Sequence, residues 1–597
     1  MLEPQSRAAL TEQLKPPPGF ELSHAVGTTF TLDLATALAV PLSFASQRLS
    51  TDDTLGVLDA IRRAADRVDV FAQAGEISMG VHSDLVAFLE PMIHPVSQRR
   101  GLFHPKVWFL EYRAGDLTSY RFLCASRNLT SDHSWDVVVR LDGVPAAAGS
   151  KRDAETINAP LVRLLREVPS WGVHPLSSER GSRILALADR WRTVAWELPS
   201  AVRGLGLHVF GTSVAAAPDL HGKRGLIISP FVSDDGIQQL RSAIRTETHL
   251  LSRAESLDRL RPGSLDSRLT TYVLDDAATY NIDEDEPTGA VPSADRLSGL
   301  HAKGFVVDRQ DGAHVFLGSA NATAAGWGNN VEVMVELVGP IPAVGVQATL
   351  DALRGFTENY PTAGGVEADP REEAERQLEA FVRRLAATRF TVRVMAGDPH
   401  DLRVWGDEHV ATVLDGHDEV RVNWHLLTRP DLGSSTVGSS EPDGVVLSGI
   451  PLADITPFIV LTARDAAGNE RRTIVVARLL DDVESRQDAV IARQLTDRRS
   501  FIRLLTLLLE LSGVWAANPA SLGGTGFLGS DGGTGLGTGL FEALVRAVGD
   551  GHSGLADARR IIEYLREHDQ QDVLPDGFDE LWNQVWAAHL ELSGGGK

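Results

Sequence analysis

Hydrophobic residues in the first 365 positions alternate between the spacing of strands and the spacing of helices. Apolar runs or two-residue periods typical of β-strands occur at 28–34, 68–72, 225–231, 248–252 and 269–274. Helical spacing is found at 52–66, 82–91, 234–245 and 255–260, and over much of 153–200. Because the order of elements restarts near residue 225, we predict an α/β fold with two duplicated mixed sheets, each flanked by helices.

The pattern changes after residue 365. A helix opening at Pro370 predicts a connector over 366–388, and two-residue alternation over 389–480 predicts a small β-sandwich of the immunoglobulin-like kind. Residues 481–597 are predicted to form a helical domain, interrupted by a glycine-rich linker at 522–539 that lacks the Lys-Ser/Thr of a phosphate-binding loop. The remaining predicted segments are a leader at 1–24, a first half at 25–185 and a second half at 186–365.

The composition is that of an ordinary globular protein, with 43% hydrophobic residues in a chain of 597. No apolar run approaches the ~20 residues that span a bilayer, and the N-terminus lacks a signal-peptide pattern, so we expect a cytoplasmic protein. Cys124 is the only cysteine, which excludes intrachain disulfides and favours a small buried strand residue. The net charge of −23 argues against a broad electrostatic hold on nucleic acid but permits a local basic cleft.

Two sets of polar residues recur in the same order in the two halves. Each has His-x-Lys at the head of an apolar run, Ser-x-Asn after the next run, and an acid before a third. The first set is His104, Lys106, Ser126, Asn128 and Asp136; the second is His301, Lys303, Ser319, Asn321 and Glu332. Lysine is otherwise rare, with six Lys against fifty-one Arg. A lysine kept at both positions favours a compact phosphate ligand, whereas His221-Gly222-Lys223, with no Asn downstream, indicates a surface turn.

These residue types suit attack on a phosphodiester. A neutral imidazole attacks phosphorus, and a second, protonated imidazole gives its proton to the departing oxygen. The lysines and asparagines are donors for the charge that develops on the non-bridging oxygens. Asp136 and Glu332 are the candidates to set the histidine tautomers, and we expect one half-site to hold a histidine, a lysine, an asparagine and its orienting carboxylate. The residues alone leave open which histidine attacks.

The two sets resemble the phospholipase D superfamily, with its HxKxxxxD and GSxN…E motifs. His301, Lys303 and Asp308 match the first motif, and Gly318, Ser319, Asn321 and Glu332 match the second. In the N-terminal copy Glu111 stands where the Asp is expected and Ala125 replaces the Gly. Asp136 follows Asn128 by eight residues, where Glu332 follows Asn321 by eleven. The resemblance covers roughly residues 25–340.

The internal duplication is interpreted as two halves around a pseudo-two-fold axis, a geometry that would bring His104 and His301 into a single cleft, so that a monomer is sufficient. The resemblance implies His104 as nucleophile, His301 as general acid and base, a phosphohistidine intermediate, and no metal or other cofactor. It also implies orienting roles for Asp136, Glu332, Asp308, Glu111, Ser126 and Ser319. The phrases around His104 and Asn128 are similar to those of bacterial phospholipase D-like proteins found with helicases in DNA-defence loci.

The function that we predict is a metal-independent nuclease, acting on DNA rather than RNA in anti-phage or mobile-element defence, with a helicase or translocase partner from the same locus. One alternative is a phospholipase or phosphatidyltransferase, which the lack of a basic amphipathic helix disfavours. Another is a non-catalytic nucleic-acid-binding subunit of a defence complex, which the two intact His-Lys-Asn sets disfavour.

Overall fold

The computed structural model describes residues 10–44, 64–80, 84–131, 134–212, 217–275, 299–367, 369–495, 497–498, 501–502, 504–505, 544, 548, 554–568, 570–575 and 577–594. Most of the helix predicted at 52–66 and all of the linker predicted at 522–539 lie outside the described residues.

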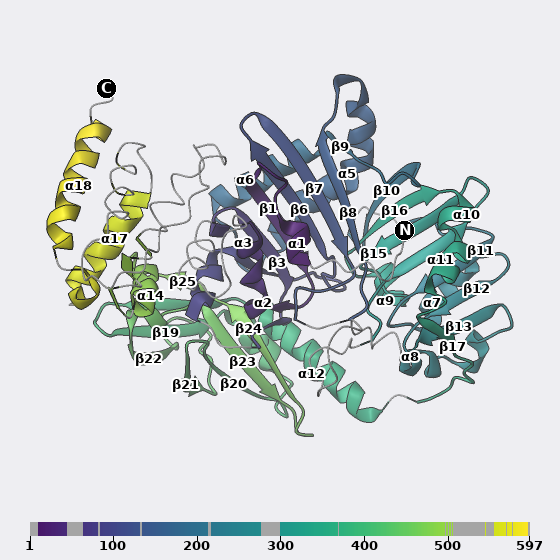
Figure 1. The fold of residues 1–597 in the computed structure, drawn as a ribbon. Helices are drawn as coiled ribbons and strands as arrows, with labels where there is room; N and C mark the ends of the chain where they lie inside the picture. The colour runs from purple at the N-terminus through teal and green to yellow at the C-terminus, as the bar shows by residue number, and fades with distance from the viewer. Residues whose placement is uncertain are drawn as a thin grey trace, which may run out of the picture.

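The first half is built on a seven-stranded sheet in the order β5-β3-β1-β6-β7-β8-β9. Its strands are β1 (Glu21–Thr29), β3 (Val68–Gln73), β5 (Ile93–Val96), β6 (Val107–Ala114), β7 (Leu117–Ala125), β8 (Val138–Pro145) and β9 (Val194–Trp196). β1 pairs with β3 in parallel and with β6 antiparallel, so the sheet is mixed. The helices α5 (Lys151–Glu167) and α6 (Ser178–Trp191) pack against each other and lie beside this sheet (Figure 1).

The second half is an eight-stranded sheet in the order β10-β16-β15-β14-β11-β12-β13-β17. Its strands are β10 (Gly204–Phe210), β11 (Arg224–Ile228), β12 (Thr248–Leu251), β13 (Leu269–Leu274), β14 (Gly304–Asp308), β15 (Ala313–Gly318), β16 (Glu332–Gly339) and β17 (Thr357–Asn359). Its helices are α7 (Asp234–Ser242), α8 (Ala254–Asp258), α9 (Ala324–Gly328), α10 (Ile341–Val344) and α11 (Val346–Leu353).

The two sheets repeat one plan. β11 is parallel to β12 and antiparallel to β14, as β1 is to β3 and β6. In each half the run β6-β7-β8 or β14-β15-β16 follows as an antiparallel meander. The predicted fold class, duplicated mixed sheets flanked by helices, is therefore confirmed.

One apolar core joins the halves. Val107 and Phe122 of the first sheet belong to the same buried cluster as Val315 and Val333 of the second. The Cys124 thiol, predicted to be buried, is 1% exposed and lies 3.9 Å from the Leu317 carbonyl oxygen across this contact. The halves are thus held rigidly enough to place one motif against the other.

Two predicted boundaries are wrong. The division between 185 and 186 falls inside α6, whose residues Ile184 and Trp191 are both fully buried against the first sheet; the segment between the sheets is 197–203. The leader was expected to reach residue 24, but β1 already begins at Glu21. Hydrophobic spacing identifies a helix but does not show which of two sheets it covers.

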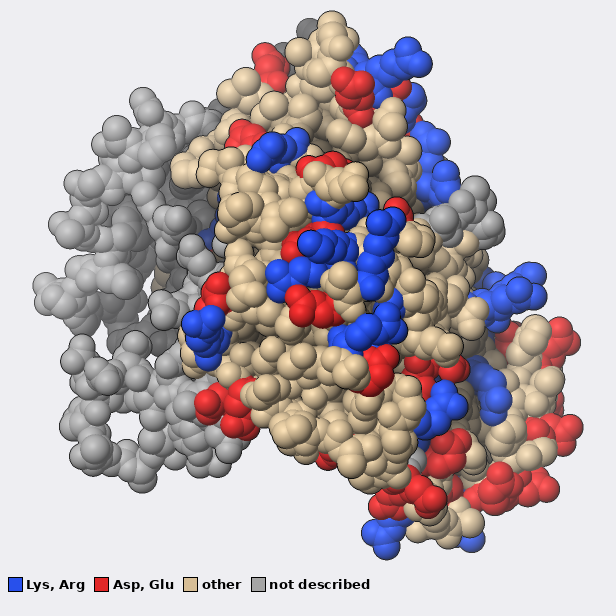
Figure 2. All heavy atoms as spheres, turned by 90° about the vertical axis from the view of Figure 1, so that its right-hand side faces the viewer, with Lys and Arg blue, Asp and Glu red and all other residues tan. Residues whose placement is uncertain are grey.

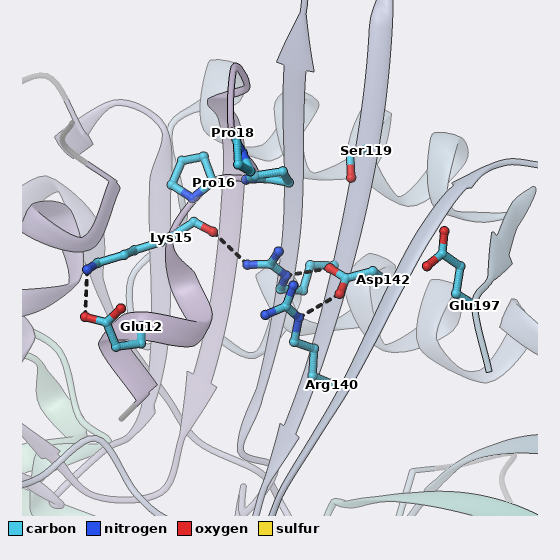
Figure 3. Close-up of a pocket in the computed structure, with 10 residues that line it drawn as sticks. Glu12, Lys15, Pro16, Pro18, Ser119, Arg140, Asp142 and Glu197 are labelled. Carbon is cyan, nitrogen blue, oxygen red and sulfur yellow. Dashed lines mark hydrogen bonds and ion pairs between the residues drawn. The ribbon is translucent and has the colours of Figure 1, made fainter. Parts of the chain in front are cut away.

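The leader contributes to the first half. Helix α1 (Leu10–Leu14) is tied to β6 by the Tyr112 hydroxyl, which donates to the Leu14 carbonyl at 2.7 Å. Arg121 donates to the carbonyls of Gln13 and Lys15 and pairs with Asp142 at 2.6 Å. These contacts border a hollow of about 410 Å³ (Figure 3). None of the residues that line this hollow belongs to either His-x-Lys set, so we interpret it as a gap between the N-terminal segment and the first sheet.

A connector helix, α12 (Pro370–Ala386), leads to two four-stranded sheets that enclose a common core. They contain β18 (Phe390–Met395), β19 (His400–Gly406), β22 (Val445–Ile450) and β25 (Arg478–Leu480), and β20 (Arg421–Leu426), β21 (Arg429–Ser434), β23 (Phe458–Arg464) and β24 (Glu470–Val476). Arg486 pairs with Glu90 of the first half at 2.8 Å, and both side chains are buried. Beyond the sheets come α14 (Arg486–Gln494), drawn in green, and α17 (Gly554–Glu567) and α18 (Phe578–Gly594), drawn in yellow in Figure 1.

The face of the second half carries mixed charge. Figure 2, which looks onto the second half, shows Lys and Arg gathered in the middle of that face with Asp and Glu among them. Over the described part of this face no continuous field of one sign is formed. Among the described residues, no helix combines the length and the apolar character needed to cross a bilayer.

Candidate active site

The two halves exchange short backbone ladders next to the histidines. The His104 amide donates to the Val331 carbonyl at 3.1 Å, and the Val331 amide donates to the Leu102 carbonyl at 2.9 Å. Gly101 makes this approach possible, since its φ is +72° and an added Cβ would lie 2.0 Å from the Asn329 carbonyl oxygen. The first histidine is thereby fixed beside the segment that begins β16 of the other half.

The equivalent ladder, related to the first by an approximate two-fold rotation, holds the second histidine. The Trp135 amide donates to the Gly299 carbonyl at 2.9 Å, and the Trp135 carbonyl accepts from the amides of His301 and Ala302 at 2.9 and 2.6 Å. His301 is therefore fixed beside the segment that carries Asp136. The two ladders relate the halves by an approximate two-fold axis.

Each histidine is oriented by the acid of the opposite half. His104 Nδ1 lies 3.0 Å from the Glu332 carboxylate, and His301 Nδ1 lies 3.0 Å from Asp136 Oδ1. The expectation that each half-site holds its own orienting carboxylate is therefore wrong. The reason is the exchanged ladders, which bring Val331 next to His104 and Trp135 next to His301.

Each acid is in turn held by the serine of its own half. The Ser126 hydroxyl donates to Asp136 at 3.2 Å, and the Ser319 hydroxyl donates to Glu332. The same hydroxyls accept from the amides of Val137 and Val333, the residues that follow the two acids. Because both serines make the same pair of hydrogen bonds, the shorter Asn128–Asp136 spacing has no effect on the site. The loop from Asn321 to Glu332 in the second half is longer and contains α9.

The lysines lie beneath the histidines. Lys106 and Lys303 are 2% and 1% exposed, and each ammonium donates to the carbonyl of the histidine two residues earlier, at 2.9 and 2.8 Å. Lys303 also donates to the Ser126 carbonyl of the other half at 3.3 Å. Two buried ammonium groups with two carboxylates give a site that is nearly neutral and lined with donors, which suits a singly charged phosphodiester.

The asparagines follow the strands β7 and β15. Asn128 accepts from the Thr31 amide through its Oδ1 at 3.4 Å. The Oδ1 of Asn321 is buried and has no hydrogen-bond partner among the described residues. Within that same part of the chain, neither side-chain amide nitrogen makes a hydrogen bond, so both remain available to an oxygen of a ligand.

The histidines are set to be neutral before substrate binds. Burial lowers the pKa of His104 to about 4, and the Glu332 carboxylate opposes the shift only in part. Burial also lowers the pKa of His301 from its usual value, again against its carboxylate partner. Burial, and then the charge of Lys303, lower the pKa of Lys106. A phosphodiester anion adds negative charge and raises all three pKa values, so proton uptake by the site is linked to binding.

Duplicated sheets that bring two His-x-Lys sets together agree with the resemblance to the phospholipase D superfamily. The fold is the duplicated α/β arrangement that this resemblance implies. No protein-family model and no curated protein sequence matches the chain.

Similar folds are found among solved structures. Yeast tyrosyl-DNA phosphodiesterase is 11% identical, with a TM-score of 0.34 over 55% of this chain and 86% of its own. Polyphosphate kinase from Porphyromonas gingivalis is 14% identical, with a TM-score of 0.32 over 62% and 50%. Phosphatidylserine synthase from Haemophilus influenzae is 15% identical, with a TM-score of 0.32 over 63% and 90%. These similarities concern the fold alone, and the chemistry is inferred from the residues of the site.

Two of the predicted orienting residues do not contact the site. Glu111 is buried and binds Ser23, Arg113 and Arg190. Asp308 accepts from the Val346 amide at the start of α11, at 3.0 Å. Each acid stands five positions after its lysine, so the two-residue period of a strand turns it to the opposite face. Both are structural residues here.

The structure adds residues that the motifs did not suggest. The ring of Phe30 lies edge-on to His104, with centroids 5.1 Å apart, and the Lys106 ammonium is 5.8 Å from the Phe30 centroid. Arg127 Nε lies 4.0 Å from Asp136. Phe30 gave no signal because it lies in a strand-like segment 74 positions before its histidine. In the described ranges, no three His, Cys, Asp or Glu side chains are grouped to hold a metal ion.

Proposed function

We propose that this protein is a metal-independent phosphodiesterase, a nuclease that acts on DNA through a phosphohistidine intermediate. The observation that supports it most is the pair of crossed histidine–carboxylate contacts. A carboxylate on Nδ1 places the reactive lone pair or proton at Nε2, in both imidazoles at once. The imidazoles are 12% and 15% exposed, so a ligand has access to them.

In the first step the Nε2 lone pair of His104 attacks phosphorus, and the bond from phosphorus to the leaving oxygen breaks. His301, protonated as the anion binds, gives its Nε2 proton to that oxygen. The ammonium groups of Lys106 and Lys303 and the side-chain amides of Asn128 and Asn321 donate to the non-bridging oxygens as their charge changes. We assign attack to His104 because of the family resemblance and because its pKa, about 4, keeps it neutral.

In the second step the now neutral His301 removes a proton from water. The resulting oxygen attacks phosphorus, the P–N bond breaks, and His104 is released as a neutral imidazole. The Glu332 carboxylate stabilises the positive charge that His104 carries while it is bonded to phosphorus, which gives that acid a role in both steps.

We further propose a role in anti-phage or mobile-element defence, with a helicase or translocase partner. This part is supported only by the likeness of the Phe103–Trp108 and Ser126–Thr130 phrases to bacterial defence proteins. The mixed charge of the face seen in Figure 2 suits a protein that a partner brings to DNA, because nonspecific attraction of DNA to that face would be weak.

The test is cleavage of labelled single- and double-stranded DNA and RNA in excess EDTA, by the wild type and by His104→Ala and His301→Ala. We expect cleavage of DNA that survives EDTA and is lost in both variants. Hydrolysis of phospholipid vesicles, with no oligonucleotide cleaved, would replace the nuclease by the lipid enzyme. Tight DNA binding without any cleavage would favour the binding subunit.

A further inference from the structure

An exposed aromatic ring stands at the edge of the site in the second half. Phe231, between β11 and α7, is 47% exposed and is the one aromatic residue among the exposed large hydrophobic residues of the described chain. The Arg253 guanidinium lies over this ring, 5.0 Å from its centroid. Exposure of a phenyl ring to water is unfavourable, so an exposed ring is a candidate contact for a ligand.

Two contacts place this pair next to the catalytic residues. Val232, which follows the ring, bridges to Ala322, the residue after Asn321. Arg253 Nε donates to the carbonyl of Leu300, the residue before His301, at 2.9 Å. The ring and the guanidinium are therefore anchored to the backbone on both sides of the second half-site.

The first half carries an aromatic ring on the matching segment. The Thr29 hydroxyl accepts from the Leu129 amide at 3.0 Å, as the Ser229 hydroxyl accepts from the Ala322 amide at 2.9 Å. Phe30 follows Thr29 and contacts His104. The two rings are thus carried by equivalent segments but one position apart: Phe30 is one residue after Thr29 and half-buried, and Phe231 is two residues after Ser229 and exposed.

We propose that Phe231, held by Arg253, is a stacking platform for a base next to the scissile phosphate, and that it makes the site select single-stranded nucleic acid. The proposal rests on the proposed phosphodiesterase function. A phenyl face accepts any unpaired base, and the guanidinium adds a cation for the adjoining phosphate. Bases within a duplex are already stacked on each other and cannot occupy the ring without being unpaired.

The chemistry of this pair favours a base over a lipid chain. A lipid needs a continuous apolar surface, whereas here a cation covers part of the one exposed ring. The other exposed large hydrophobic residues of the described chain are aliphatic, and Leu117 among them lies at the far end of β7 from Ser126. Leu117 therefore serves as a matched control, since it is exposed but distant from the site.

The test is fluorescence anisotropy with a labelled 12-nucleotide single strand, its abasic counterpart and a hairpin duplex, all in a His104→Ala background that prevents turnover. We expect Phe231→Ala to weaken single-strand binding by about 10- to 100-fold. Phe231→Trp should retain binding, Leu117→Ala should leave it unchanged, and Phe231→Ala should not alter binding of the abasic strand. Single-strand affinity within twofold of the parent, an equal loss for the abasic strand, or no single-strand binding by the parent would each overturn the platform.

A substrate without bases separates this inference from the proposed function. With intact His104, the wild type should cleave the abasic strand, and the control Leu117→Ala should do so at the same rate. A wild type that cleaves neither the abasic strand nor DNA would refute the phosphodiesterase, and the anisotropy result would still decide the platform. A loss of abasic-strand cleavage in Phe231→Ala as large as its loss of DNA cleavage would show that the ring only supports the fold of the site, which contradicts the platform.

Discussion

The crossed contacts predict that Glu332 serves the histidine of the other half. We therefore expect Glu332→Gln to impair the step in which His104 attacks phosphorus, and Asp136→Asn to impair the proton transfers by His301. Glutamine is nearly the same size as glutamate and can keep the bond from Ser319, so the change removes the charge rather than the shape.

The size of the effect follows from the geometry. Opposite charges 3.0 Å apart attract by about 5 kcal/mol at an effective dielectric of about 20. The amide retains a neutral hydrogen bond to the imidazole that is worth about 1 kcal/mol. We therefore expect Glu332→Gln to lose about 2–4 kcal/mol of transition-state stabilisation, which is about a 30- to 1000-fold slower attack.

A substrate with an activated leaving group separates the two steps. Nitrophenolate leaves without a proton, so a 4-nitrophenyl nucleotide ester needs His104 for the first step but His301 only for hydrolysis of the adduct. In a single-turnover experiment Asp136→Asn should give a burst of nitrophenolate at the rate of the wild type and should accumulate phosphohistidine. Glu332→Gln should slow the burst itself and accumulate no adduct.

The opposite pattern would refute the crossed assignment. If Glu332→Gln accumulated the adduct while Asp136→Asn lost the burst, each acid would serve the histidine of its own half. Glu111→Gln is the control, because Glu111 is as buried as Glu332 but forms its hydrogen bonds with Ser23, Arg113 and Arg190 instead of with a motif histidine. It should change the unfolding midpoint without changing the burst.

Three further predictions concern stability and reactivity. Burial lowers the pKa of His174 to about 4, so the unfolded state binds more protons than the folded state between pH 6.5 and 4, and the free energy of unfolding should decrease as the pH is lowered through this range. In denaturant titrations at several pH values, His174→Gln should reduce the dependence of the free energy of unfolding on pH; an unchanged dependence would contradict this. Arg486→Met leaves the buried Glu90 carboxylate unpaired and should cost about 3–5 kcal/mol in urea unfolding, whereas the double variant with Glu90→Gln should be closer to the wild type. Burial raises the pKa of the Cys124 thiol to about 12, so maleimide at pH 8 should label this cysteine only in denaturant. Rapid labelling of the folded protein would show that the apolar contact between the two halves opens.

Local sequence was sufficient for the parts of the site that a single segment specifies. The His-x-Lys pairs, the Ser-x-Asn turns and the duplication were predicted because strand periodicity and turn residues are properties of neighbouring positions. The buried Cys124 and the surface turn at His221, whose side chain is 81% exposed, were predicted in the same way. The error at residue 185 arose where a helix had to be assigned to one of two sheets, which depends on packing.

The sequence by itself determined which side chains carry the chemistry and that they occur twice. Only the tertiary structure decided which carboxylate serves which histidine, because Glu332 and His104 are 228 positions apart and meet through the two-fold relation of the halves. It also decided that Glu111 and Asp308 turn away from the site, and that Phe30 lies against His104. Contacts across a two-fold axis are set by how two complete sheets pack, and no local pattern of residues specifies that packing.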